Sequence, residues 1–366
     1  MHMADIPSLR SKLFFWFILS AFSVFFAEVV SGSSPLPFFN PFNPADIWGW
    51  IALMPLYGLH TIVLASVVFS GGKPRFYALF LAGAIFGLYE AYITKVLWHP
   101  GWGAVWTVGG VAVVELVVIA FFWHPFMSFI IPLTAGETVL TGSREIVDGM
   151  PAWMRRWLTS RNIVTVFILF AVWAGLTHGG TAPSMLQTFL SCLISAGFLL
   201  GLVHVWKKRT GAKSYSMRSL LPTRTQLAAL MVPLLAIYIV FGAGILPQRI
   251  PGLFSQAVIW AIYGILFTLL YLAIRRTNTD LDPVHPLVRP RIGWKWMLAF
   301  FGVFTVSSVV WNPTGLSVLV LVLSWFPAIF IGLYFLSWSA KEALAGMVKI
   351  NKRGDYPVPA QGATGR

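Results

Sequence analysis

Apolar runs long enough to cross a lipid bilayer recur along this sequence, and the run Phe76–Trp98 carries a glutamate, Glu90, inside it. A crossing helix needs about 20 apolar residues, and such runs fold as helices because no water satisfies the backbone inside a bilayer. Gly83, Gly87 and Ala91 recur every four residues, so they form a stripe of small residues against which a neighbouring helix packs. Glu90 lies on or beside this stripe. We therefore expect its carboxyl to face protein rather than lipid.

The composition agrees with a chain that lies mostly in lipid. Hydrophobic residues make up 57% of the 366 residues and charged residues 10%, whereas about 25% of a soluble domain is charged. The sequence therefore predicts an all-α polytopic membrane protein. Its net charge of +14 does not indicate nucleic-acid binding, because the basic residues lie in short loops, as the positive-inside rule predicts for the cytoplasmic side. We expect these loops to contact anionic lipid headgroups.

Several classes of function lack their sequence signatures. Cys192 is the single cysteine, which excludes an intramolecular disulfide and a cysteine metal cluster. The zinc-protease helix HExxH and the Walker A loop are absent. We expect no cofactor and no metal, and the sequence favours a protein that is not an enzyme. It contains no permitted glycosylation sequon, which fits the plasma membrane of a prokaryote.

The distribution of Lys and Arg predicts the topology. Ten crossings with both termini in the cytoplasm place 24 of the 26 Lys and Arg residues on the cytoplasmic side, Lys95 and Arg249 being the exceptions. We expect Lys95 to extend its ammonium toward the outer surface. The ten crossings are predicted near 13–30, 47–70, 76–98, 104–123, 162–178, 184–206, 225–246, 253–274, 294–311 and 315–337.

The stretch Gly103–Leu140 admits two interpretations. It is almost continuously apolar, contains Glu115, and is interrupted at His124-Pro125. Two crossings fit its length, but only one keeps the basic residues on both sides of it in the cytoplasm. We therefore predict one crossing near 104–123, followed by a re-entrant or interfacial segment at 125–141. His124 is then expected to make backbone or interface contacts at a helix end.

We expect a single transmembrane domain at 1–340 and a polar cytoplasmic tail at 341–366. Within the domain, 1–143 is the half that holds a candidate site and 144–340 is apolar. Glu28, Glu90 and Glu115 all lie in the first four crossings, and His60 lies near the middle of the second. These four residues are the candidate site for a substrate or a proton. The alternative is three separate acids, each pinning two helices together.

Two further stretches have functional and structural interpretations. Ser31–Asp46 is rich in proline and phenylalanine and has no Lys or Arg, so it is either an aromatic belt that anchors a connection outside the cytoplasm or a lid. Asp280, Asp282 and His285 lie in a basic loop. They are either solvated residues or ligands for a divalent metal bound to a diphosphate.

Two segments resemble a known group of sequences. AEVVSGSSPL at Ala27–Leu36 and YEAYITKVLWHPGW at Tyr89–Trp102 are similar to uncharacterised prokaryotic multi-pass membrane proteins, which share an AEVVSGS-P turn and a YE-x-x-x-TK helix. In that group a second acid follows the first on the third helix, whereas this chain has Ala91. The resemblance implies a membrane protein and no established activity.

The residues support three hypotheses about function. The first is a proton-linked carrier or permease for a small molecule, with Glu90 central and with Glu28, Glu115 and His60 as partners. The second is a membrane-embedded enzyme that acts on a lipid or a lipid-linked substrate through the same acids. The third is a non-catalytic membrane subunit or assembly factor. The oligomeric state is left open.

Overall fold

A computed structural model describes residues 6–33, 52–101, 103–159, 163–180, 182, 184–211, 215–279 and 293–354. Residues 34–51, which hold most of the predicted belt or lid, lie outside the described residues, as do Asp280, Asp282 and His285. The described chain is helical apart from one two-stranded sheet. This confirms the all-α membrane fold.

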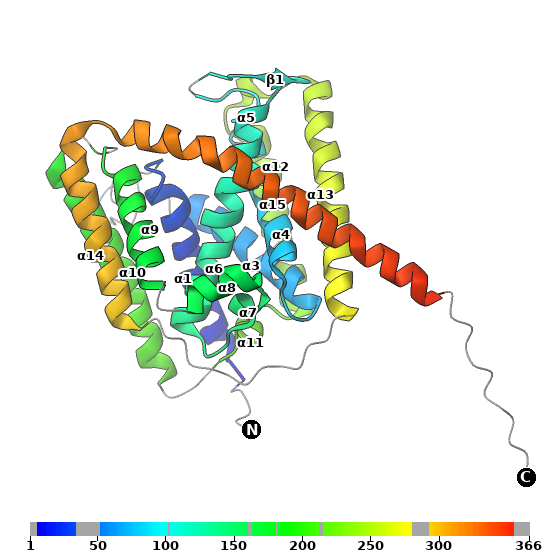
Figure 1. Ribbon diagram of the computed structural model, residues 1–366, viewed down its shortest axis with the longest axis horizontal. Helices are drawn as coiled ribbons and strands as arrows, with labels where there is room; N and C mark the ends of the chain where they lie inside the picture. Colours follow the sequence, from blue (N-terminus) through cyan, green and yellow to red (C-terminus); the bar gives the residue numbers. More distant parts are fainter. Residues whose placement is uncertain are drawn as a thin grey trace, which may run out of the picture.

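The helices of the N-terminal half form the centre of the molecule (Figure 1). Helix α1 spans Leu9–Val24 and continues as a π-helix, η1, at Phe25–Val29. Helix α3 spans Met54–Ser70 and α4 spans Phe76–Ile93. A hairpin of β1 (Thr107–Val108) and β2 (Val111–Ala112) then leads into α5 (Val113–Glu115), the π-helix η3 (Leu116–Ile130) and α6 (Ile131–Leu140).

The remaining helices surround this centre. Helices α9 and α10 stand with α14 on one side, α13 stands on the other, and the long α15 crosses the front (Figure 1). The hairpin lies at one end of the bundle, and α7, α8 and α11 lie at the opposite end. Their bounds are α7 Glu145–Gly149, α8 Ala152–Thr159, α9 Ile163–His178, α10 Met185–Thr210, α11 Met217–Leu220, α12 Arg224–Gly244, η4 Pro247–Arg249, α13 Leu253–Thr279, α14 Trp294–Trp311, η5 Asn312–Thr314 and α15 Ser317–Gly354.

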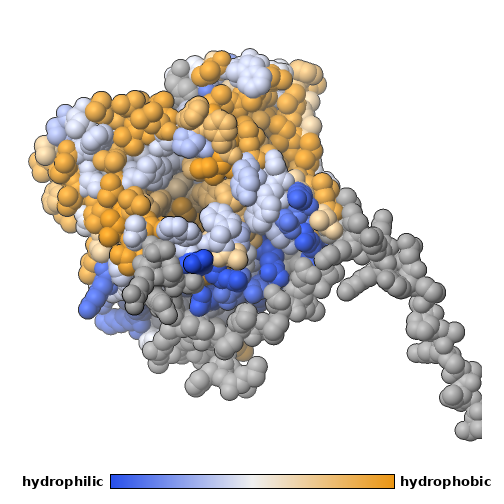
Figure 2. All heavy atoms as spheres, in the orientation of Figure 1, coloured by the Kyte–Doolittle hydropathy of each residue, from blue (hydrophilic) through white to orange (hydrophobic). Residues whose placement is uncertain are grey.

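Eight of the described helices are long and apolar enough to cross a membrane, and two shorter apolar helices span Met54–Ser70 and Val164–His178. Nine of them lie close to predicted positions, and the fourth spans Val113–Leu140 where 104–123 was predicted. Several apolar helices of this length show a multi-pass membrane location. The number of crossings and their orientation stay predictions. Figure 2 shows strongly hydrophilic residues gathered at the end that carries α7 and α8, below a broad apolar surface.

The stretch from Val113 to Leu140 is one continuous helix of 28 residues. The separate re-entrant segment predicted at 125–141 is therefore wrong, because the helix does not break at His124-Pro125. Proline lacks an N–H and its ring clashes with the carbonyl four residues earlier in an α-helix. Pro125 lies inside the π-helix η3, whose hydrogen bonds run to the fifth residue and open a wider turn. That wider turn accommodates the proline.

Helix α4 is buried along almost its whole length because its small residues admit a close neighbour. A Cβ added at Gly83 would lie 2.5 Å from the Cα of Pro125, and one at Gly87 would lie 2.8 Å from the Cα of Ala120. Gly83 and Gly87 therefore let the backbones of α4 and η3 meet. The structure confirms the packing predicted from the stripe of small residues.

The helix expected to reach Trp98 ends at Ile93, since Lys95 takes a left-handed φ of 63°. The prediction that Lys95 extends toward the surface is wrong. Its side chain is buried, and Nζ donates to the carbonyls of Ile93 (2.9 Å), Phe241 (3.2 Å) and Gly242 (2.6 Å). Burial lowers the pKa of Lys95 below its usual value. Two of these carbonyls lie in the last turn of α12, and that of Phe241 also accepts from the amide of Ile245 at 3.0 Å.

Candidate functional site

Three helix ends bring titratable side chains together at the end of the bundle that carries the hairpin. Glu28 lies in η1 at the end of the first helix, Tyr57 lies in the first turn of α3, and Glu90 lies in the last turn of α4. His124 reaches them from the middle of η3. We name these four residues, with His60 and Ser128, the Glu90 cluster.

The centre of the cluster is the pair formed by Glu90 and His124. Glu90 Oε2 lies 3.0 Å from His124 Nε2, and the side chains are 14% and 4% exposed. On the other side of the imidazole, Nδ1 lies 2.6 Å from the hydroxyl of Ser128, one turn further along the same helix. This second hydrogen bond holds the ring with Nε2 toward the carboxyl. The imidazole is thus held from two sides, by Ser128 of its own helix and by Glu90 of α4.

A second carboxyl lies next to this pair. The hydroxyl of Tyr57 donates a short hydrogen bond to Glu28 Oε1. The Tyr57 ring is buried, with its centroid 6.0 Å from the ring of His124. Glu28 interacts electrostatically with both Glu90 and His124. Two carboxyls, an imidazole and a phenol thus share one site.

His60 lies against the same site from α3. Its Nδ1 is 2.6 Å from the carbonyl of Leu56, and its ring stacks on Phe86 at 4.8 Å. Among the described residues its buried Nε2 has no hydrogen-bond partner. A buried donor or acceptor without a hydrogen-bond partner costs about 1–3 kcal/mol of folding free energy. The Nε2 atom of His60 could therefore form a hydrogen bond with a bound molecule.

Glu115 is also fully buried, and it comes nine residues before His124 on the same continuous helix. The structure thus gathers Glu28, His60 and Glu90, and the inclusion of Glu115 in that site stays a prediction.

The sequence analysis missed His124, Tyr57 and Ser128 as members of the cluster. A break expected at Pro125 had placed His124 at a helix end. The stripe of small residues on α4 is the sequence signal that points to His124, because the stripe marks the face of α4 on which another helix packs. In the structure a Cβ at Gly87 would lie 2.8 Å from the Cβ of His124. The turn of η3 that packs on the small residues near Glu90 is therefore the turn that supplies its partner.

Another buried acid, Glu137, was also missed, and its surroundings differ. Its carboxylate is fully buried and accepts from the amides of Ile146 (3.0 and 3.1 Å) and Val147 (3.2 Å) and from the hydroxyl of Ser143 (3.2 Å). These amides belong to the start of α7, where an anion is favoured by the helix dipole. Every bond to the carboxylate comes from residues six to ten positions along the chain.

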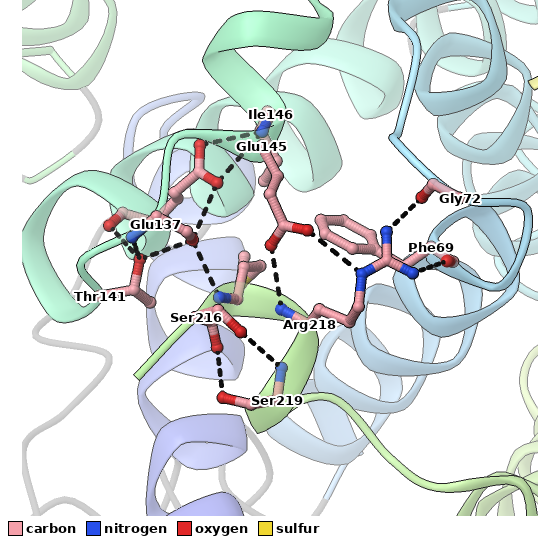
Figure 3. A network of polar contacts seen from close by, with 11 residues as sticks. Phe69, Gly72, Glu137, Thr141, Glu145, Ile146, Ser216, Arg218 and Ser219 are labelled. Atoms are coloured by element: carbon pink, nitrogen blue, oxygen red, sulfur yellow. Dashed lines mark hydrogen bonds and ion pairs between the residues drawn. The ribbon is translucent and has the colours of Figure 1, made fainter. Parts of the chain in front are cut away.

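The same region is tied to α3 and α11 through Arg218 (Figure 3). The guanidinium pairs with Glu145 at 3.2 Å and donates to the carbonyl of Phe69 at 2.7 Å and to that of Gly72. Met217 donates its amide to Ser143 at 2.9 Å. We name Glu137, Ser143, Glu145 and Arg218 the Glu137 clamp. It joins three connections at the end of the bundle opposite the Glu90 cluster.

Within the described ranges no group of three or more His, Cys, Asp or Glu side chains is arranged to hold a metal ion. What the Glu90 cluster does offer is two carboxyl groups, a phenol and an imidazole next to one another, with the side chain of Glu90 14% exposed.

Comparison with known proteins places the chain among membrane proteins. A model of an uncharacterised membrane protein family matches residues 17–349. A relative from Archaeoglobus fulgidus, described as an uncharacterized protein, is 31% identical over 261 residues, which cover 71% of this chain and 77% of the relative. No solved structure matches. The two segments singled out for their resemblance, at 27–36 and 89–102, stay predictions as family motifs.

Proposed function

This chain belongs to that uncharacterised family of membrane proteins, and we propose that it is a proton-linked carrier of a small molecule in which Glu90 and His124 exchange the coupled proton. The observation that carries the proposal is the 3.0 Å contact between Glu90 and His124, inside a helix bundle and with Glu90 14% exposed. The resemblance to uncharacterised relatives adds no activity of its own.

The pair allows a proton to move without leaving an isolated charge in the membrane. Transfer of the proton from the imidazolium to the carboxylate converts an ion pair into two neutral groups. An isolated buried charge is far more costly than either state, because its solvation is lost without compensation. A solute that approaches Glu90 and replaces its hydrogen bond to His124 would therefore change which group holds the proton.

Glu28 and Tyr57 complete the proposed site. Glu28 interacts electrostatically with both Glu90 and His124. The Tyr57 hydroxyl donates to Glu28, and the Tyr57 ring lies beside that of His124, with the centroids 6.0 Å apart. A solute that binds at Glu90 would therefore meet a second carboxyl and a phenol beside it.

The carrier is favoured over the membrane-embedded enzyme by the position of Ser128. Ser128, His124 and Glu90 are connected in the order of a hydrolase triad. However, the side chain of Ser128 is 0% exposed, and a nucleophile must reach its substrate. The serine therefore orients the imidazole.

The test uses purified protein in liposomes that contain a pH indicator. A pH gradient is imposed, and pools of amino acids, organic acids, sugars and nucleosides are added outside. We expect one pool to cause solute-dependent proton flux with the wild type and none with Glu90→Gln, whose amide cannot titrate. Asp148→Asn, in an ion pair outside the membrane spans, is the matched control and should retain the flux.

The melting temperature of each variant is measured in the same preparation. Glu90→Gln should fold, because the amide has a similar volume and can still form a hydrogen bond with His124. Wild-type flux in this variant would remove Glu90 from the mechanism. Uptake of a radiolabelled solute without any proton flux in the wild type would show a carrier that is not proton-linked.

A further inference from the structure

A large apolar cavity is lined by none of the residues of the Glu90 cluster, although it shares η1 and η3 with them. Its volume is about 520 Å³, and its walls come from the first helix, the start of α4, η3–α6, α8, α9, α10 and α14. Figure 2 shows a hollow with apolar walls on the face of the molecule in view. The volume falls in the range of about 300–1,000 Å³ that small-molecule sites occupy.

The cavity walls offer mainly apolar contacts to a ligand and few polar groups. Most of the lining side chains are aromatic or aliphatic, and Thr134 and Thr138 supply hydroxyls. Both hydroxyls donate to carbonyls one turn earlier in their own helix, at 2.7 and 2.6 Å. A polar ligand would lose its water here without compensation, whereas an alkyl chain would not.

The rim of the cavity carries positive charge. Helix α8 contributes Trp153, Met154 and Trp157 to the wall, and its Arg155 and Arg156 are exposed. This alternation of tryptophan and arginine is typical of a helix in the headgroup region. On the opposite wall Lys295 is exposed two residues before the lining residue Met297.

Two acids precede α8, and each forms an ion pair with an arginine outside α8, while the guanidinium of Arg155 donates to the carbonyl of Asp148 at 3.4 Å. Asp148 pairs with Arg144 at 3.7 Å, and Glu145 pairs with Arg218 at 3.2 Å. Figure 2 shows strongly hydrophilic residues along the lower edge of the hollow, over α7 and α8. The cavity is thus an apolar chamber with a cationic edge.

We propose that this cavity binds one anionic phospholipid of the surrounding bilayer, with a hydrocarbon chain between η3–α6 and α14 and the phosphate beside Arg155 and Arg156. The apolar walls match the hydrocarbon chain, and the cations match the headgroup. Basic pockets between transmembrane helices recognise anionic headgroups in this way. The site does not depend on the proposed transport activity.

The test measures lipid binding by native mass spectrometry of the purified full chain. The probes are phosphatidylglycerol and phosphatidylcholine with identical acyl chains, each titrated from detergent. We expect one tightly bound phosphatidylglycerol and a clear preference for it over phosphatidylcholine. Arg155→Gln with Arg156→Gln should weaken phosphatidylglycerol roughly fivefold for each cation removed and leave phosphatidylcholine unchanged.

A second variant tests the chamber itself. Ala135→Leu fills space beside the lining of α6 and should weaken both lipids. Ala229→Leu and Arg224→Gln change exposed residues of α12, outside the cavity, and should change neither. Phosphatidylglycerol with a photoreactive group on its acyl chain should label the peptides that contain 131–139 and 297–301 in the wild type, which keeps the test valid if Ala135→Leu fails to fold.

Three results would overturn the proposal. The first is equal wild-type affinity for the two lipids. The second is photolabelling spread evenly over α12 and α13. The third is a wild type that takes up no lipid and has the mass of a dimer, because a second copy would then fill the hollow.

Discussion

The Glu90 cluster and the Glu137 clamp each bind a carboxyl with the help of the continuous helix 113–140, which supplies His124 to one and Glu137 itself to the other, yet the two carboxyls have different partners. The clamp holds Glu137 with backbone amides and a hydroxyl within ten residues, and the side chain is 0% exposed. The cluster holds Glu90 with a histidine from another helix and leaves it 14% exposed. The donors of the clamp are backbone amides and a hydroxyl, which only donate to the carboxylate, whereas the partner of Glu90 is an imidazole nitrogen, which can donate or accept.

This difference shows that burial alone does not identify a functional acid. An unpaired charge in an apolar environment is costly wherever it lies, and both sites avoid that cost. What differs is whether the partner can exchange a proton and whether another molecule can reach it. The predictions that follow test this distinction by comparing the two sites in stability.

The largest loss of stability is expected from the clamp. Glu137→Ala removes the acceptor for two buried amides and a hydroxyl, and we expect a loss of about 3 kcal/mol, because hydrogen bonds to charged groups are strong and the donors stay buried. Glu137→Gln keeps one acceptor oxygen and should lose about half as much. Thermal unfolding in one detergent measures both. A Glu137→Ala variant with the wild-type melting temperature would show that the hydrogen bonds to Glu137 do not stabilise the fold.

The next effect concerns the contact that brings Glu90 to His124. In Gly87→Ala the new Cβ would lie 2.8 Å from Ala120 Cα and from His124 Cβ, so α4 and η3 must separate at a cost of about 1–3 kcal/mol. Gly264→Ala is the matched control, since a Cβ there meets nothing within 4 Å. The control should gain about 0.5–1 kcal/mol, as alanine favours a helix over glycine. Equal melting temperatures for the two variants would contradict the close packing.

Two substitutions of Arg218 distinguish the effect of its charge from the effect of its planar guanidinium within the clamp. Arg218→Gln removes the ion pair with Glu145 and the bonds to the carbonyls of Phe69 and Gly72, and we expect a loss of about 1–2 kcal/mol. Arg218→Lys keeps the charge without the planar fork and should recover only part of it. The measurement is again thermal unfolding. Full recovery by lysine would mean that charge alone holds these connections together.

The smallest change in stability is expected inside the Glu90 cluster. Tyr57→Phe keeps the ring beside His124 and removes one donor to Glu28. Because Glu28 is only partly buried, water can replace the hydroxyl, and the loss should be about 1 kcal/mol or less. Solute-linked proton flux should nevertheless change, since Glu28 no longer accepts the hydrogen bond from Tyr57. A loss as large as that of Glu137→Ala would show that the cluster is as structural as the clamp.

Much of the fold was predictable because bilayers restrict it. Apolar runs and basic loops identify helices without tertiary information, and the spacing of Gly83 and Gly87 predicted the packing of α4. The interpretation failed where a local rule was overridden. Pro125 normally ends a helix, but the π-helix accommodates it, and a left-handed residue at Lys95 ended α4 early.

The site was predicted only in part, for the same physical reason. Acids inside apolar runs are visible in a sequence, and Glu28, Glu90 and His60 were identified that way. Their partners depend on which turn of another helix faces them. Tyr57 and His124 become partners only through three-dimensional packing, and Glu137 accepts from amides at the start of α7, whose sequence carries no distinctive motif.

The buried Lys95 has a consequence for the order of events during synthesis. Its ammonium binds carbonyls 146 and 147 residues further along the chain. A ribosome adds about 5–20 residues per second, so α12 follows α4 by roughly 10–30 s. Through that interval Lys95 lacks two of its three acceptors, and the charge must stay hydrated. The end of α4 that carries Glu90 therefore reaches its final packing only after α12 has entered the membrane.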